Sequence, residues 1–380
     1  MTPPSRADAD AAPTSILFAG GGSGGHIAPG LAIIEAIRDL DPAATCRAVC
    51  SDRPVDAHML SRAGVPFLPV AALPLSVRPD RFVRFAIRFR RARRVIAAEI
   101  RRHGVTRVVA LGGFVAAPAA AAARSVRCPI TLVNLDAVPG RANRWIAHRA
   151  STVLSAVPTP ATPDFASMIT GMPVRRAAIA SDPPEACRAS FGLDPDRPTL
   201  LVTGASQGAE SINRMMTALL SGHGGLFSDW QVLHLSGAGH DAELRAAYAE
   251  AGVRARVEPF VDAMGRAWGA ASLAISRAGA NSVAEAIANA VPTVFMPYPY
   301  HADQHQRLNA WPYVERDLAL LMDDEIDATR NAAAMAGMLG PLLAPDAATD
   351  APGPLAAIRS RLVARPTEPA AAIIARSLLG

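Results

Sequence analysis

The chain contains 380 residues, of which half are apolar and 19% are charged, and its formal net charge is +5. This is the composition of a packed globular protein, and the length favours two domains over one. The chain contains arginine but no lysine. The sequence therefore excludes enzymes that depend on a P-loop lysine, a pyridoxal-phosphate lysine or an aldolase Schiff base.

The first thirteen residues, 1–13, are rich in proline, alanine and aspartate and lack an apolar run. We therefore expect a disordered tail there rather than a signal peptide. The four cysteines are scattered and form no C-x-x-C pair, which favours a reduced, cytosolic compartment. The most apolar window, 108–123, is interrupted by glycine and proline and is too short to span a bilayer.

The rest of the first half alternates apolar strands with amphipathic helices. This alternation predicts a parallel sheet covered by helices on both faces. The predicted strands are 15–19, 45–50, 106–111 and 129–133, and the predicted helices are 27–38, 55–63, 81–102, 117–126 and 142–150.

The second half repeats the alternation after a proline-rich connection at 157–184. The predicted strands are 199–203, 230–235, 254–257, 272–275 and 292–296, and the predicted helices are 209–221, 241–251, 262–270, 282–290 and 304–316. The sequence thus predicts an α/β protein with two doubly wound, Rossmann-like domains facing each other across a cleft. We expect these domains to span 14–170 and 171–365, with a closing helix in 366–380 docking back on the first.

A glycine-rich turn follows the first strand and fits the pattern G-x-G-x-x-G from Gly20 to Gly25. With Asp52 near the end of the second strand as a ribose ligand, this pattern is compatible with a dinucleotide site. The turn also ends in His26, a titratable imidazole at a helix start that a dinucleotide site does not require. His26 as an ordinary helix-start residue is the simpler alternative.

Polar residues in the segment 276–309 gather only where a strand ends and a helix begins. In an open α/β sheet, ligands bind at the carboxyl ends of strands, and helix N-termini there accept phosphate groups. The segment therefore predicts half of a nucleotide site. Helix capping is the competing interpretation for the pairs Ser282/Glu285 and Asp303/Gln306, and also for Ser206 and Gln207 before the helix near Ala209.

Several ordered motifs together give the chain a family resemblance along nearly its whole length. They are G-G-G-S-G-G-H-I-A-P-G-L-A (20–32), L-G-G-F-V-A-A-P (111–118), A-N-R-W-I-A (142–147), G-M-P-V-R (171–175), G-A-S-Q-G-A-E-S-I-N (204–213), E-P-F-V-D-A-M (258–264), S-R-A-G-A-N-S-V-A-E (276–285) and H-A-D-Q-H-Q-R-L-N-A (301–310). The chain resembles the MurG family, inverting glycosyltransferases of the GT-B fold that use UDP-N-acetylglucosamine (UDP-GlcNAc) to make lipid II for peptidoglycan.

The resemblance implies a UDP-GlcNAc site on the second domain. Uracil would lie between Phe260 and Val261, and Glu285 would bind the ribose hydroxyls. The nucleotide, its diphosphate and the GlcNAc hydroxyls would be bound by Arg175, Ser206, Gln207, Ala280, Asn281, Ser282, His305 and Gln306.

The same resemblance implies an acceptor site on the first domain. His26 would face the attacking hydroxyl as the general base, and Asp136 is a substitute base. The acceptor and its diphosphate would contact Gly22, Ser23, Gly24, Gly25, His26, Phe114, Asn134 and Asn143. The chain departs from the family pattern at Phe114, Asn134, Asp136 and Met172, which concerns the acceptor more than the donor.

The implied activity is inverting transfer of GlcNAc to the 4-hydroxyl of the muramoyl sugar of lipid I. No D-x-D triplet or His/Cys cluster supports a metal site, so we expect neither a metal nor a tightly bound cofactor, and no nucleic-acid partner. Two alternatives stay open: a related transferase with another lipid or small-molecule acceptor, and a catalytically impaired binding protein. The hypothesis of a dinucleotide-dependent oxidoreductase does not account for the polar residues of the segment 276–309.

One predicted helix, 81–102, begins with a basic and aromatic run. Phe82, Phe85, Phe89 and Ile96 share a stripe, flanked by arginines that include Arg84, Arg88 and Arg91. Such a helix suits an anionic membrane surface, although a core-facing helix with a solvated arginine face is the plainer interpretation. Because the implied acceptor is a membrane lipid, we expect peripheral binding at the cytoplasmic face of the cell membrane.

Overall fold

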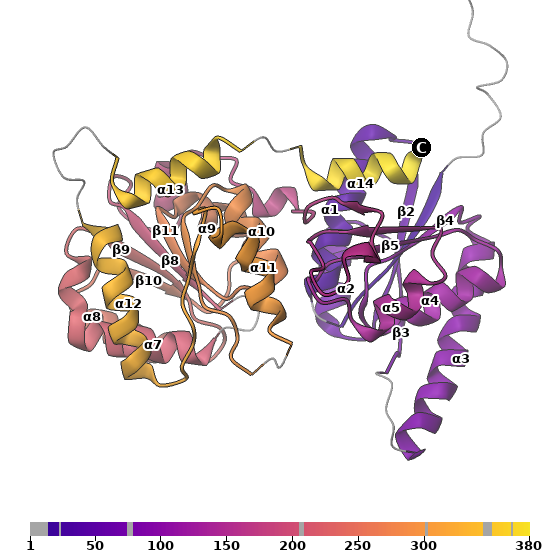
Figure 1. Cartoon of the computed structure of the whole chain (residues 1–380), viewed down its shortest axis with the longest axis horizontal. Helices are drawn as coiled ribbons and strands as arrows, with labels where there is room; N and C mark the ends of the chain where they lie inside the picture. The colour runs from indigo at the N-terminus through magenta and orange to yellow at the C-terminus, as the bar shows by residue number, and fades with distance from the viewer. Residues whose placement is uncertain are drawn as a thin grey trace, which may run out of the picture. The chain divides into compact units, whose positions relative to one another are not determined.

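The computed structural model describes residues 14–22, 24–73, 79–204, 209–300, 303–344, 352–365 and 368–380 (Figure 1). The chain divides into two compact units. Unit 1 comprises Met1–Pro173 and Glu368–Gly380, and unit 2 comprises Val174–Thr367. The division falls three residues beyond the predicted boundary. Residues 1–13, for which a disordered tail is predicted, lie outside the described part.

Unit 1 is built on a seven-stranded, wholly parallel sheet in the order β3-β2-β1-β4-β5-β6-β7. From β1 the strands are added in one direction as far as β3, and from β4 they are added in the other direction as far as β7. The topological switch therefore lies between the neighbouring strands β1 and β4. The strands are β1 (Ser15–Ala19), β2 (Thr45–Ser51), β3 (Phe67–Val70), β4 (Arg107–Ala110), β5 (Ile130–Asn134), β6 (Thr152–Ser155) and β7 (Met168–Ile169).

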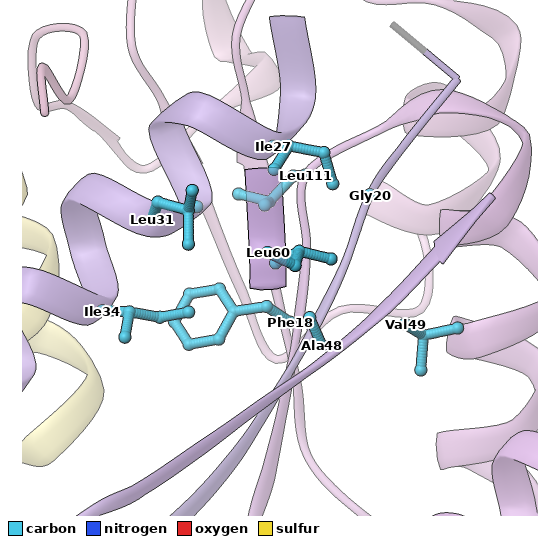
Figure 2. Close-up of a pocket in the computed structure, with 10 residues that line it drawn as sticks. Phe18, Gly20, Ile27, Leu31, Ile34, Ala48, Val49, Leu60 and Leu111 are labelled. Carbon is cyan, nitrogen blue, oxygen red and sulfur yellow. The ribbon is translucent and has the colours of Figure 1, made fainter. Parts of the chain in front are cut away.

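Helices cover both faces of this sheet, and successive side chains along β1 point to opposite faces. Ile16 and Phe18 pack with one group of helices, and Leu17 with the other. The first group is α1 (Gly24–Leu40), α2 (Pro54–Arg62) and α14 (Ala370–Leu379), and the second is α3 (Pro79–Arg102), α4 (Gly113–Ser125) and α5 (Arg141–Ala147). Figure 2 shows the first core, where Phe18 of β1 meets Leu31 of α1 and Leu60 of α2 around a small apolar cavity.

Unit 2 has a six-stranded parallel sheet in the order β10-β9-β8-β11-β12-β13. Its topological switch lies between β8 and β11. The strands are β8 (Thr199–Thr203), β9 (Gln231–Leu235), β10 (Ala255–Glu258), β11 (Leu273–Ser276), β12 (Thr293–Phe295) and β13 (Leu320–Leu321). The helices are α6 (Pro184–Ser190), α7 (Glu210–His223), α8 (Asp241–Glu250), α9 (Met264–Ala270), α10 (Ala280–Ala288), α11 (His305–Val314), α12 (Ala328–Leu343) and α13 (Pro354–Val363).

The α/β class with two doubly wound domains is therefore confirmed, but the prediction from sequence omitted several helices and strands. The short strands β3, β6, β7 and β13 and the helices α6, α12 and α13 are absent from the prediction. Strands β7 and β13 have two residues each and lie at sheet edges, so they carry no periodic signal. Helix α12 contains two glycines and a proline, Pro341, and such residues weaken the sequence signal of a helix.

Candidate active site

In unit 1, the glycine turn after β1 is fixed by an acidic residue that the sequence interpretation overlooked. Asp56, in the first turn of α2, is fully buried, and its Oδ2 accepts a hydrogen bond from the Gly22 amide at 2.8 Å. The same oxygen accepts from the Ser51 hydroxyl at 2.6 Å. A Cβ at position 21 would lie 2.5 Å from that oxygen, so only glycine fits there. The expected acidic residue, Asp52, is exposed instead.

His26 lies in the first turn of α1 with its imidazole against the turn that begins α4. A Cβ on Gly112, whose φ is +108°, would lie 3.1 Å from both His26 Nε2 and Asn143 Oδ1. The His26 Nδ1 and the Asn143 Oδ1 are buried, and neither has a hydrogen-bond partner among the residues that the structure describes. Buried polar atoms without partners are rare and costly, which marks this place as a candidate ligand contact.

The charge state of His26 suits a general base. Burial lowers its pKa below the ordinary histidine value, because the imidazolium ion loses hydration. The carboxylates of Asp136 and Asp56 act in the opposite direction. The imidazole is therefore neutral near pH 7 and has negative charges nearby that would stabilise it once it accepts a proton.

Asn134, an acceptor-binding candidate by resemblance, makes its hydrogen bonds within unit 1. Its amide is fully buried and donates to the Asp136 carbonyl at 2.7 Å and to the Ser155 hydroxyl at 2.9 Å. Its Oδ1 accepts from the Asn143 amide at 3.0 Å. All three contacts are internal, so Asn134 orients Asn143 and the loop after β5. A glutamate could not donate these two hydrogen bonds, which explains an amide at this position.

The remaining acceptor candidates are spread around this turn. Gly24 and Gly25 begin α1, Phe114 is exposed in the first turn of α4, and Ser23 lies outside the described residues. The structure thus brings His26, Asn143 and the loop carrying Asp136 to one edge of the unit 1 sheet. Met172 packs against the core that contains β1 and α1.

In unit 2, Glu285 occupies the second turn of α10, beside the switch strand β11. The indole N–H of the buried Trp268 donates to its Oε2 at 3.0 Å. Burial raises the pKa of Glu285, while the Trp268 hydrogen bond and the nearby Arg175 oppose this shift. Helix α10 begins at Ala280 after Gly279, which makes no side-chain cap, so the capping interpretation of Ser282 and Glu285 is wrong.

Arg175 is held near this glutamate through the segment that follows it. Asn289, at the end of α10, accepts from the Ala180 amide and donates to the Ala178 carbonyl, each at 2.8 Å. Its amide also donates to the Glu285 carbonyl at 2.8 Å. The first turn of α10, which contains Ala280, Asn281 and Ser282, is partly exposed.

The loop before α11 carries the other polar candidates. The Asp303 carboxylate accepts from the His305 backbone N–H at 3.3 Å and contacts the His305 Nδ1 at 2.8 Å. The Gln306 Oε1 accepts from the Tyr298 amide at 2.9 Å, and the N-cap residue of α11 is Gln304 rather than Asp303. The reciprocal capping box predicted for Asp303 and Gln306 is therefore wrong. His305 and Gln306 instead lie with Tyr298 at the carboxyl end of β12.

A buried ion pair that the sequence interpretation missed joins these loops. Arg277, directly after β11, pairs with Asp324 at 2.9 Å and donates to the Met296 carbonyl at 3.0 Å. It also donates to the Ser211 hydroxyl of α7 at 2.5 Å. Burial alone would raise the pKa of Asp324, but hydrogen bonds from Ser211, Asn331 and others hold it below the ordinary value.

Two further pairs of donor candidates lie in loops of unit 2, and the structure describes one of these pairs. Phe260 and Val261 lie in the loop between β10 and α9, and the Phe260 ring is exposed. Ser206 and Gln207 lie outside the described residues. Within the described ranges, no cluster of three or more His, Cys, Asp or Glu side chains could hold a metal ion.

Helix α3 divides into two halves with different surroundings. Ile96 and Ile100 of its second half are buried against α4 and the sheet, so Ile96 belongs to the core and not to an exposed stripe. In the first half, Phe82 is 50% exposed and Ile87 is 61% exposed. Neighbouring phenylalanine rings at 82, 85 and 89 lie 6.4 and 5.6 Å apart. Figure 1 shows this half extending beyond the rest of unit 1. The second half of α3 thus faces the core, whereas the Phe82 side chain in the first half is exposed.

None of the helices in the described ranges has the length and apolar character needed to cross a membrane.

Known protein families match both units. Residues 16–155 match the Glycosyltransferase family 28 N-terminal domain, and residues 199–331 match the Glycosyltransferase family 28 C-terminal domain. Two doubly wound units with these matches define a glycosyltransferase. The crystal structure of Acinetobacter baumannii MurG shares the fold, GT-B, with a TM-score of 0.71 over 97% of this chain and 99% of that chain, at 22% identity.

Relatives of known name identify the family. The UDP-N-acetylglucosamine–N-acetylmuramyl-(pentapeptide) pyrophosphoryl-undecaprenol N-acetylglucosamine transferase of Nocardioides sp. is 38% identical, over 81% of this chain and 84% of the relative. The protein of the same name from Mycolicibacterium smegmatis is 35% identical, over 82% of this chain and 81% of the relative. The chain belongs to this family of N-acetylglucosaminyltransferases, the MurG family.

Proposed function

We propose that this protein transfers GlcNAc from UDP-GlcNAc to the 4-hydroxyl of the muramoyl sugar of lipid I and inverts the anomeric centre. The observation that carries the proposal is the pair of unsatisfied buried atoms in unit 1, His26 Nδ1 and Asn143 Oδ1, in a chain of this family. Such a pair offers a base and a hydrogen-bond acceptor to a sugar hydroxyl.

In the proposed reaction, the acceptor oxygen attacks C1 of GlcNAc and the bond from C1 to the UDP oxygen breaks. The hydroxyl proton passes to the imidazole of His26. Asp136 is the second candidate base, because its carboxylate interacts with His26. UDP leaves with its negative charge, which Arg175 and the N-terminal turn of α10 would offset. No tightly bound cofactor is part of the proposal.

The donor would bind to unit 2 through residues around the β8–β11 switch. Glu285 would accept hydrogen bonds from the ribose hydroxyls, and Phe260 and Val261 would flank uracil. The turn from Ala280 to Ser282, with Ser206 and Gln207, would bind the diphosphate, and His305 and Gln306 would bind the GlcNAc hydroxyls. The exposed ring of Phe260 and the hydrogen bond that fixes the Gln306 side chain to the Tyr298 amide support these roles.

A transfer assay with labelled UDP-GlcNAc tests the function. Wild-type protein should label a lipid I analogue and should not label an unglycosylated polyprenyl diphosphate or a simple sugar alcohol. Labelling of the other acceptors in preference to lipid I would favour the alternative transferase. Donor binding without any transfer would favour an impaired binding protein.

We further propose that the exposed first half of α3 binds an anionic membrane surface, at the cytoplasmic face of the cell membrane. Phe82, with Phe85 and Phe89 beside it, would enter the interface. The arginines Arg84, Arg88 and Arg91, here called the α3 arginine cluster, are all exposed and would contact lipid phosphates. A peripheral position would bring unit 1 to its lipid-linked acceptor.

A further inference from the structure

Asp56 has a bonding pattern that a structural role alone does not explain. Its Oδ2 accepts three hydrogen bonds: from the Gly22 amide at 2.8 Å, from the Ser51 amide at 3.2 Å and from the Ser51 hydroxyl at 2.6 Å. This oxygen therefore holds the glycine turn against the end of β2. These three donors converge on a single atom of the side chain.

The other carboxylate oxygen, Asp56 Oδ1, is buried and has no hydrogen-bond partner in the described part of the chain. An asparagine could accept the same three hydrogen bonds through its one oxygen without burying a charge. Burying an ionised carboxylate with one oxygen unpaired costs free energy. The charge at this position is thus more than the turn requires, which points to an electrostatic role.

His26 is the group on which this charge acts. A Cβ on Gly20 would lie 3.3 Å from the His26 Cβ, and a Cβ on Gly21 would lie 2.5 Å from the Asp56 Oδ2, so the two side chains lie against successive residues of the turn. The charged groups around the imidazole are Asp56 from α2 and Asp136 from the loop after β5. Arg53 donates to the Gly22 carbonyl from the far side of the turn.

We propose that Asp56 is a positioning residue for the transfer reaction, which fixes the glycine turn beside His26 and places its carboxylate near the imidazole. This inference rests on the proposed function. The charge stabilises the imidazolium that forms when the acceptor hydroxyl loses its proton. It also disfavours a phosphate at Gly22, whose N–H already binds Asp56, so the acceptor diphosphate binds elsewhere than at this amide.

Two substitutions separate the two parts of the role. Asp56→Asn keeps an oxygen for the three donors and removes only the charge, whereas Asp56→Ala removes both. Asp52→Asn is the matched control, because it removes the same charge from an exposed residue that lies between β2 and α2. All three variants are compared with wild type in folded, full-length protein.

The first readout is the pH profile of kcat/KM for GlcNAc transfer. Removing a negative charge lowers the pKa of His26, so in Asp56→Asn the acidic limb should move to lower pH and kcat should fall about 10-fold. In Asp56→Ala, kcat should fall about 100-fold because the turn also loses its anchor. The donor KM should not change, and Asp52→Asn should match wild type. A folded Asp56→Asn enzyme with an unmoved limb overturns the proposal.

The second readout does not depend on activity. Protein carrying ¹³Cε1-labelled histidine is titrated by NMR, and the His26 signal is the one absent from His26→Gln. The proposal predicts that His26 titrates at lower pH in Asp56→Asn than in wild type and in Asp52→Asn. Equal titration in all three overturns it. If wild type transfers no GlcNAc, the proposed function fails, and this titration still decides the role of Asp56.

Discussion

Replacing Glu285 by glutamine should separate donor binding from folding. The side chain is a partly buried carboxyl that accepts from the Trp268 indole at 3.0 Å, and its pKa is raised because the charged form is poorly hydrated. Glutamine keeps an oxygen for Trp268 and carries no charge. We therefore expect Glu285→Gln to be at least as stable as wild type while it binds UDP-GlcNAc more weakly.

The magnitude follows from the two contacts that the carboxylate makes in this account. Loss of a charged hydrogen bond to ribose costs roughly 1.5–3 kcal/mol of binding, or about 10- to 150-fold in Kd. In Glu285→Ala the same affinity is lost, and Trp268 is also left with a buried, unpaired N–H, which costs about 1–3 kcal/mol of stability. Alanine should thus lower both quantities, and glutamine only the first.

Isothermal titration calorimetry with UDP-GlcNAc and denaturant unfolding at pH 7.5 measure the two quantities separately. Glu250→Gln, at the exposed end of α8 in the same unit, is the control and should change neither. A Glu285→Gln protein that binds UDP-GlcNAc as tightly as wild type would refute the donor-binding role. Glu285 would then serve only to satisfy Trp268.

Three further predictions follow from the same structure. His26→Ala should lower kcat by about 100- to 10,000-fold with little effect on the donor KM, and near-normal kcat would transfer the role of base to Asp136. Changing the α3 arginine cluster to glutamine should abolish most low-salt co-sedimentation with anionic vesicles, because each arginine contributes about 1 kcal/mol of binding free energy. Unchanged binding would contradict the membrane role. The control is a protein in which Arg214, Arg254 and Arg256 are changed to glutamine. Burial lowers the pKa of His234 to about 3, so the unfolded chain binds one more proton than the folded chain from about pH 6.5 down to that value. Stability should therefore fall as the pH falls, and the stability of wild type relative to His234→Gln should drop by about 2 kcal/mol between pH 7.5 and 5 in denaturant unfolding; a difference that does not vary with pH would contradict this.

The longer elements of the fold could be predicted because hydrophobic periodicity and glycine turns report local structure directly. Strand β1 and helix α1 are examples, since an apolar run leads through Gly20–Gly22 into an amphipathic segment. The edge strands β7 and β13 could not be predicted, because their pairing depends on neighbouring strands that are distant in sequence. Helix α12 was hidden by Pro341 and its glycines.

The candidate site was predictable where a motif carried the signal and obscure where the contact is long-range. His26 and Glu285 belong to glycine-containing sequence motifs, 20–32 and 276–285, that can be recognised without the structure. The partner of Glu285, Trp268, lies 17 residues away on another helix, and the carboxylate that holds the first turn is Asp56 rather than Asp52. In the sequence Asp56 resembles an ordinary acidic residue in the first turn of a helix. Only the packing of Gly21 against it reveals its role.

The stereochemistry and position of the new glycosidic bond test the central claim most directly. Wild-type protein would be incubated with UDP-GlcNAc and a soluble lipid I analogue, and the disaccharide product examined by proton NMR. The account predicts a β-linked GlcNAc on the 4-hydroxyl of the muramoyl sugar, which is inversion relative to the α-linked donor. An α-linked product, a product on another hydroxyl, or donor consumed without a glycosylated lipid I analogue would contradict it.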